Sequence, residues 1–228
     1  MELEVEELPS WMQVQVDLTK ANSGKRFSFA LKGEFTKSFL ADCSHILNVG
    51  CGFGRELVLF KVPVVGVDLD TSVLSVAKRF GKDLLVADAH NLPFRDGMFD
   101  GVAMAETIEH VKSPLKALLE VRRVLESGGK LALQTPNRRI TCLQKTEGHL
   151  QEFTKHELSR LVKDCGFYVL RRTGSTIPFI PASQHKVLLL LDHNHLVFRL
   201  WKQLNRTLST RLTWDTILLC RKTSDVPS

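Results

Sequence analysis

The segment from Ile46 to Glu56 constrains the fold of this chain more than any other part of the sequence. It reads ILNVGCGFGRE, an apolar run of strand type that leads into glycines at alternate positions, Gly50, Gly52 and Gly54. Glycine has no Cβ, so such a turn can lie directly against a bound ligand. A second apolar run, VVGV, ends in Asp68. A glycine-rich turn after one strand, with an acid at the tip of the next, is typical of adenosine sites in open α/β sheets.

The spacing of the glycines narrows the class of ligand. A dinucleotide fingerprint reads GxGxxG, whereas this chain reads GxGxG and has Arg55 at the third glycine position. The Gly-Lys-Ser/Thr of a P-loop is not part of this turn. Four further segments follow in order: VVGVDLD, LLVADAHNLPF, FDGVAMAETIEHV and VRRVLESGGKLALQTPN. Through these five segments, residues 25–175 resemble the S-adenosylmethionine-dependent methyltransferases with a Rossmann-like fold.

Strand and helix patterns alternate along this part of the chain. This alternation predicts an α/β fold with an open, mostly parallel sheet and helices on both faces. The resemblance implies seven strands, the last of them antiparallel. Strands are predicted at 46–50, 64–68, 84–87, 99–104, 130–134, 167–171 and 214–221. Helices are predicted at 26–40, after a cap at Thr71 or Ser72, at 113–125 with Gly128 and Gly129 ending it, and at 154–165 with a capping box.

The length of 228 residues suits one well-packed domain. We predict a lead-in at 1–24, a cofactor-binding core at 25–175, a helical insert at 176–212 and the last strand at 213–222. The insert carries an apolar stripe with basic residues on another face. Such a helix can pack on the sheet, cover the acceptor site as a lid, or contact an anionic membrane. The stripe consists of Val197, Leu200, Trp201, Leu204 and Leu208.

Composition points to a cytoplasmic protein. The first seven residues are acidic rather than a secretory signal, and no apolar run approaches the roughly 20 residues that span a bilayer. Five cysteines without CxxC spacing favour reduced thiols over a disulfide frame or a zinc site. The net charge of +6 can attract RNA, anionic lipid or phosphorylated substrates, or can belong to an ordinary solvated surface.

The resemblance also implies which residues hold S-adenosylmethionine. Asp68 is expected to accept hydrogen bonds from both ribose hydroxyls, and Asp88 from the adenine amine. The Ala89 amide is expected to donate to the adenine ring, with Leu69 and Leu92 beside it. The remaining cofactor-binding residues expected from the resemblance are Gly50, Cys51, Gly52, Gly54 and Glu106.

The segment Glu106-Thr-Ile-Glu109-His110 follows the fourth strand and supplies the catalytic candidates. On a helical turn, both glutamates and His110 share one face, which makes a plausible half-site for a divalent metal. His149 lies in the later loop EGHLQEFT and is expected to complete that site. Without a metal, His110 and His149 remain candidate general bases, and Glu109 can be structural.

Here the chain resembles two branches of the family. The polyprenyl-catechol O-methyltransferases of ubiquinone synthesis carry Glu-x-x-Glu-His and a later histidine before a Phe-Thr/Ser-x-x-Glu-Leu helix. The small-RNA 2′-O-methyltransferases carry Glu-x-x-Glu-His and a histidine-rich loop, but this chain lacks their double-histidine loop. In both branches, these residues are associated with Mg²⁺.

The sequence therefore predicts methyl transfer from S-adenosylmethionine to an oxygen of a small-molecule or lipid-like acceptor. Two alternatives remain open, an RNA methyltransferase and a noncatalytic protein that kept the fold. Cofactor turnover separates the noncatalytic protein from the two enzymes, and salt-sensitive RNA binding separates the two enzymes from each other.

Overall fold

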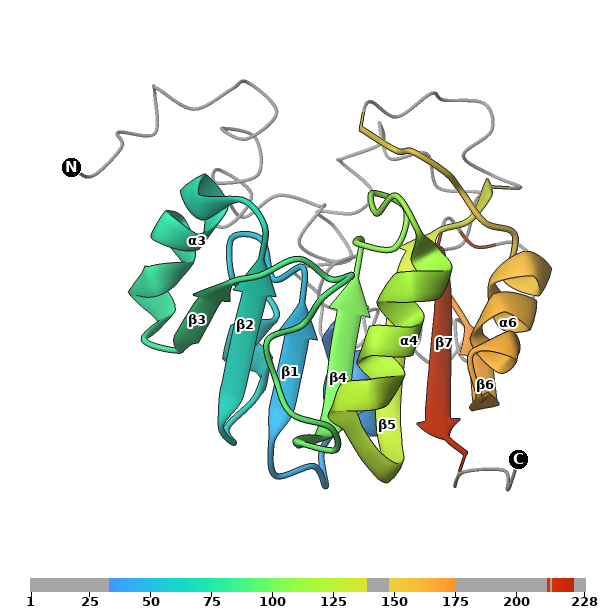
Figure 1. The fold of residues 1–228 in the computed structure, drawn as a ribbon, viewed down its shortest axis with the longest axis horizontal. Helices are drawn as coiled ribbons and strands as arrows, with labels where there is room; N and C mark the ends of the chain where they lie inside the picture. The colour runs from blue at the N-terminus through green and yellow to red at the C-terminus, as the bar shows by residue number, and fades with distance from the viewer. Residues whose placement is uncertain (1–32, 139–147, 175–212, 214, 224–228) are drawn as a thin grey trace, which may run out of the picture.

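A computed structural model describes residues 33–138, 148–174, 213 and 215–223 (Figure 1). In this part of the chain, seven strands form one sheet in the order β3-β2-β1-β4-β5-β7-β6. The first five strands are parallel, and β7 runs antiparallel to both β5 and β6. The predicted fold class is thereby confirmed. The strands are β1 (Ile46–Val49), β2 (Val64–Asp68), β3 (Asp83–Val86), β4 (Phe99–Ala105), β5 (Leu125–Pro136), β6 (Phe167–Thr173) and β7 (Asp215–Lys222).

Three α-helices have bounds within the described residues: α3 (Thr71–Ala77), α4 (Pro114–Val124) and α6 (Lys155–Asp164). Residues 33–39 are also helical, in agreement with the helix predicted at 26–40. Two short 3₁₀ turns, η2 (Leu57–Leu59) and η3 (Lys78–Phe80), were not predicted.

The predicted caps of α4 and α6 are present. Ser113 caps α4, and Thr154 and Glu157 form the capping box of α6. Neither Thr71 nor Ser72 caps α3, because the side chain of Asp70 accepts the hydrogen bond from the Ser72 backbone. Aspartate is as good a cap as serine, and here it stands one residue earlier.

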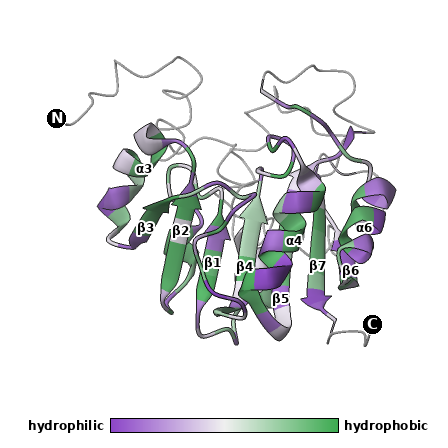
Figure 2. Cartoon of the chain, viewed as in Figure 1, coloured by the Kyte–Doolittle hydropathy of each residue, from purple (hydrophilic) through white to green (hydrophobic). Residues whose placement is uncertain are grey.

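Both faces of the sheet are covered, and the core divides accordingly. One buried cluster joins the sheet to α4 and α6, for example through Leu131 and Leu133. The other lies on the opposite face and includes Leu40, Leu74 and Ala132. Successive residues of β5 thus point to opposite clusters, as expected for a strand buried on both sides. Figure 2 shows mostly hydrophobic strands, and helices on which hydrophobic and hydrophilic residues alternate.

The transition from α4 to β5 differs from the prediction. The strand begins at Leu125, directly after the helix, so Gly128 and Gly129 lie within β5. The pairing of β4 with β5 shifts register between Phe99 and Gly101, and Gly128 adopts a positive φ of 76°. The glycines therefore accommodate an irregularity in the strand instead of ending the helix.

Several predictions lie outside the described residues. They concern the lead-in at 1–24, the start of the first helix and the insert at 176–212 with its stripe. Among the described helices, none is long and apolar enough to cross a membrane. The division of the chain into segments of one domain stays a prediction.

Candidate active site

The glycine turn after β1 is held against the end of β2 by hydrogen bonds. The backbone nitrogens of Gly50 and Cys51 both donate to the Val67 carbonyl oxygen, at 2.8 and 2.9 Å. The Gly52 nitrogen donates to Asp68 Oδ2 at 2.8 Å. The turn and the acid predicted from the sequence are therefore parts of one structure at the carboxyl end of the sheet.

Two glycines of the turn have different roles. A Cβ on Gly50, at a φ of +69°, would lie 2.2 Å from Thr107 Oγ1. A Cβ on Gly52, at a φ of +49°, would meet nothing within 4 Å among the described residues. Both need the left-handed conformation that glycine adopts readily. Gly50 thus makes room for Thr107, whereas Gly52 leaves an open space in which a ligand can lie against the backbone.

Asp68 is fixed by the backbone on both of its oxygens. Oδ2 accepts from Gly52, and Oδ1 accepts from the Asp70 nitrogen at 3.0 Å. An ionised carboxylate has about four acceptor positions, so each oxygen keeps capacity for another donor. This arrangement fits a ribose diol, which offers two neighbouring hydroxyl donors. The adjacent Leu69 side chain is 69% exposed, so its apolar surface is available to a ligand.

Asp88 stands beyond the end of β3 with a half-exposed side chain. Its Oδ1 accepts from the backbone nitrogen and from the ring Nδ1 of His90, at 2.9 and 2.6 Å. These bonds, together with the nearby Lys116 charge, hold the pKa of Asp88 below its usual value. A carboxylate can therefore face the ligand beside Ala89. Leu92 is buried in the core at 3% exposure, which leaves little of its surface for the expected contact with adenine.

Cys51 lies in the turn as a buried thiol. Burial and the neighbouring charge of Asp68 raise its pKa to about 12. A thiol with such a pKa stays protonated near neutral pH and is a poor nucleophile. The side chain therefore acts as a small packing residue beneath the turn.

Glu106 departs from the helical turn expected for residues 106–110. It has a left-handed φ of 50°, so the backbone cannot begin a regular helix there. Its Oε1 accepts from Gln134 Nε2 at 2.9 Å, and its backbone nitrogen donates to the backbone carbonyl oxygen of Gln134. Gln134 of β5 thus fixes Glu106, which lies apart from the group formed by Glu109 and His110.

Glu109 is fully buried behind the site. Its Oε2 accepts from Thr135 Oγ1 at 2.9 Å. Its backbone oxygen accepts from the nitrogens of Leu150 and Gln151, at 2.9 and 3.2 Å. These contacts attach the loop that carries His149 to the segment after β4.

The two predicted histidines meet at the same place. The rings of His110 and His149 stand edge to face, with centroids 4.9 Å apart. His110 Nδ1 lies 2.8 Å from the Gly148 oxygen, and His149 Nδ1 lies 2.9 Å from Glu152 Oε1. Because both partners are acceptors, the proton of each neutral ring belongs on Nδ1 and the lone pair on Nε2.

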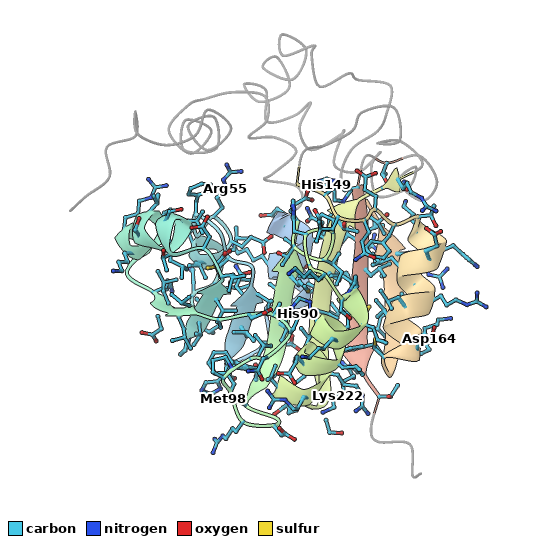
Figure 3. The ribbon with its side chains drawn as sticks, turned by 45° about the horizontal axis from the view of Figure 1, so that its top comes forward. Arg55, His90, Met98, His149, Asp164 and Lys222 are labelled. Carbon is cyan, nitrogen blue, oxygen red and sulfur yellow. The ribbon has the colours of Figure 1, made fainter. Side chains whose placement is uncertain are left out.

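Glu109, His110 and His149 each offer one ligand atom, and these atoms all lie within 4.8 Å of one another. The structure thus brings together three of the four predicted metal-binding residues and leaves Glu106 outside. Figure 3 shows His149 and Arg55 at this edge of the molecule, whereas Met98 and Lys222 mark the opposite edge.

Sequence reasoning missed the residues that support the site. Thr107 fills the space above Gly50, and its carbonyl oxygen accepts from the His110 nitrogen at 3.0 Å. The sequence shows Glu152 three residues after His149, but this spacing alone does not predict a hydrogen bond between the two side chains. The other supporting residues are His90, Gln134 and Thr135.

A comparison with protein families agrees with this geometry. Residues 47–133 match the model of a family described as methyltransferase domain. The match covers less than half of the chain, so it shows that these residues are similar to a methyltransferase domain. The matched residues include the glycine turn, both acids and the segment 106–110, whereas His149 and Glu152 lie beyond them.

Curated relatives match parts of the chain around this domain. "Probable S-adenosylmethionine-dependent methyltransferase" of Mycobacterium tuberculosis is 32% identical over 139 residues, which are 57% of this chain and 50% of that protein. "Probable tRNA methyltransferase 9B" of Mus musculus is 34% identical over 106 residues, which are 42% of this chain and 24% of that protein. The chain spans about half the length of the curated relatives it matches, or less.

A solved structure shares the fold of this chain. A SAM-dependent methyltransferase of Thermotoga maritima superposes with a TM-score of 0.66 at 21% identity, over 88% of this chain and 91% of that one. Similarity at this level shows the Rossmann-like fold alone. The resemblance to the ubiquinone-synthesis branch is not confirmed by these relatives.

Proposed function

We propose that this protein transfers a methyl group from S-adenosylmethionine to an oxygen of a small-molecule or lipid-like acceptor. One observation carries the proposal. Two imidazoles with their lone pairs on Nε2 stand at the carboxyl end of the sheet, next to the open glycine turn. Thr107 connects the two places, since it touches Gly50 and accepts from His110.

The residues of the glycine turn and of the two strand tips suit the cofactor. When bound, S-adenosylmethionine supplies a methyl group on a positively charged sulfur, which a nucleophile can take. Gly52 offers bare backbone, Asp68 offers two fixed acceptor oxygens, and Asp88 offers a half-exposed carboxylate. These residues bind and orient, which is the main task of a protein whose cofactor carries the reactive group.

His149 is the better candidate for the general base. Its side chain is 10% exposed, and Glu152 holds its Nδ1. A hydroxyl of the acceptor can then give its proton to Nε2, and Glu152 stabilises the resulting imidazolium. His110 is exposed, and its Nδ1 bonds to the neutral Gly148 carbonyl instead of a carboxylate. We therefore assign His149 as the base and His110 to the wall of the site.

The same group also has the donors of a divalent-metal site. A histidine that binds a metal usually donates its other ring nitrogen to a carbonyl or a carboxylate, as both rings do here. Mg²⁺, however, prefers oxygen ligands, whereas two nitrogens and one carboxylate suit Mn²⁺ or Zn²⁺ better. If an ion binds, Glu109, His110 and His149 would hold it, and it would polarise the acceptor oxygen.

RNA methylation is the second candidate. The similarity to a protein named as a tRNA methyltransferase and the sequence pI of about 9.1 favour it. The match covers only 24% of that relative, which weakens the argument. RNA binding by charge alone would be strongly salt-dependent, which makes it easy to recognise.

The proposal is tested by measuring S-adenosylhomocysteine release with catechols, polyprenyl phenols, glycans and RNA. We expect turnover with a hydroxylated small molecule or lipid. Turnover confined to RNA would favour the second candidate, and binding of the cofactor without any turnover would favour a noncatalytic role. Each reaction is repeated in EDTA and after addition of Mg²⁺, Mn²⁺ or Zn²⁺. Full activity in EDTA would exclude a required, exchangeable metal and leave His149 as the base.

A further inference from the structure

The segment between β3 and β4 carries Asp88 and Ala89. It crosses in front of β1 to the N-terminal end of α4 and then returns to the start of β4 (Figure 1). His90 lies on this segment, with its side chain 16% exposed (Figure 3). Its ring joins two elements, because Nδ1 lies 2.6 Å from Asp88 Oδ1 and Nε2 accepts from the Ser113 backbone nitrogen at 3.0 Å.

The partners of His90 define its protonation. The backbone N–H of Ser113 can only donate, so Nε2 must carry the lone pair. The proton of the neutral ring therefore sits on Nδ1 and points to Asp88. Together with the His90 backbone nitrogen, this gives Asp88 Oδ1 two donors. Among the described residues, Oδ2 receives no such bond and is left as the acceptor for a ligand.

The rest of this segment is attached to α4 independently of His90. Arg123 donates to the carbonyl oxygens of Leu92 and Phe94, and Glu120 accepts from the Leu92 nitrogen. Arg123 also pairs with Glu120 and Asp96. A change at His90 should therefore leave the course of the segment intact and release chiefly the carboxylate of Asp88.

We propose that His90 is a positioning residue that gives the site its selectivity for adenine. It occupies Oδ1 of Asp88 and thereby presents Oδ2 to the exocyclic amine of the base. The inference rests on the proposed function, in which Asp88 faces adenine. An amine donates to a carboxylate, whereas the carbonyl oxygen of hypoxanthine at the same position would meet it acceptor to acceptor.

The probe is a pair of ligands, S-adenosylhomocysteine and S-inosylhomocysteine, in which a carbonyl oxygen replaces the adenine amine. Calorimetry on the wild type should show adenine preferred by roughly 10- to 100-fold, the size of one hydrogen bond to a charged group. Two variants of His90 each keep one of its two side-chain hydrogen bonds, the one to Asp88 or the one from Ser113. In His90→Asn, the side-chain amide can replace Nδ1 and still donate to Asp88. In His90→Gln, the amide oxygen can replace Nε2 and still accept from Ser113, while the bond to Asp88 is lost.

We expect His90→Asn to keep the adenine preference and His90→Gln to reduce it to about threefold or less, with both variants folded. A structural role alone would lower the melting temperature without changing the ratio of the two affinities. Asp88→Asn provides the second measurement. It should lose the same preference, and adding His90→Gln to it should change the ratio no further.

The inference is overturned if His90→Gln and the wild type show the same preference. It is also overturned if the double variant loses preference beyond Asp88→Asn, because His90 would then act elsewhere. Failure of the proposed function looks different, since the wild type itself would then bind neither ligand.

Discussion

The two halves of the site are built in different ways. Over β1, β2 and β3, the proposed cofactor side consists of backbone positions and of carboxylates fixed by backbone N–H groups, all between residues 50 and 90. Over β4 and β5, the proposed acceptor side consists of titratable side chains that come from segments distant in sequence. His110 and Gly148, which share a hydrogen bond, are 38 residues apart. The cofactor side is therefore a local structure, and the acceptor side depends on the packing of a later loop.

We therefore expect variants of the proposed acceptor side to lower the turnover number, and variants of the proposed cofactor side to weaken cofactor binding. The largest effect is expected on the acceptor side, for His149→Asn. The asparagine amide can keep the hydrogen bond to Glu152, but the variant lacks Nε2, the proposed proton acceptor. The turnover number should therefore fall about 100-fold or more. The affinity for S-adenosylhomocysteine should stay within about twofold, as measured by calorimetry.

The matched control is His156→Asn, which changes an exposed histidine in the first turn of α6. It should leave both quantities unchanged. Equal turnover in the His149 variant and the wild type would remove His149 from the chemistry.

On the cofactor side, Asp68→Ala should weaken S-adenosylhomocysteine binding at least about tenfold. Its carboxylate is expected to accept two ribose hydroxyls, and a hydrogen bond to a charged group contributes about 1.5–3 kcal/mol. Asp83→Ala, at the exposed start of β3, is the control for a lost surface charge. A folded Asp68 variant with the affinity of the wild type would contradict the ribose assignment.

Variants of Gly50 and Gly52 are expected to differ in stability and in cofactor binding. Gly50→Ala should lower the free energy of unfolding by about 2 kcal/mol or more, because a left-handed alanine is strained and its Cβ overlaps Thr107. Gly52→Ala carries similar backbone strain but no such overlap, so its loss of stability should be smaller. It should nevertheless weaken cofactor binding. Thermal unfolding with and without S-adenosylhomocysteine measures both effects, and the opposite ranking of stabilities would refute the assigned roles.

The smallest effect concerns the attachment of the segment after β3 to α4. The hydrogen bond from Arg123 holds the pKa of Glu120 below its usual value. A carboxyl group with a lowered pKa in the folded state stabilises the fold above its unfolded pKa of about 4.3, and that stabilisation is lost as the pH falls through the lowered pKa. Glu120→Gln should therefore cost about 1 kcal/mol near pH 7 and less at lower pH. Unfolding curves from pH 7 to pH 3 measure this, and a constant difference would exclude the charge as its cause.

The sequence predicts the proposed cofactor side better than the proposed acceptor side. The glycine turn, Asp68 and Asp88 were predictable because each stands at the end of a strand with a clear apolar pattern. Parallel strands in such a sheet bring their carboxyl ends to one edge. The capping box of α6 and the cap of α4 were equally local. The cap of α3 and the start of β5 were misplaced by a few residues, since several neighbouring residue types satisfy the same rule.

The amino-acid sequence by itself determined the class of fold and the place of the glycine turn and its acids, because both depend on short-range periodicity and on glycine stereochemistry. The tertiary structure alone decided which acids and histidines lie together. The left-handed backbone at Glu106 and its bond to Gln134 separate it from Glu109. Hydrogen bonds from the later loop to the Glu109 carbonyl bring His149 beside His110. Such contacts join segments far apart in the chain, and no local pattern of residues encodes them.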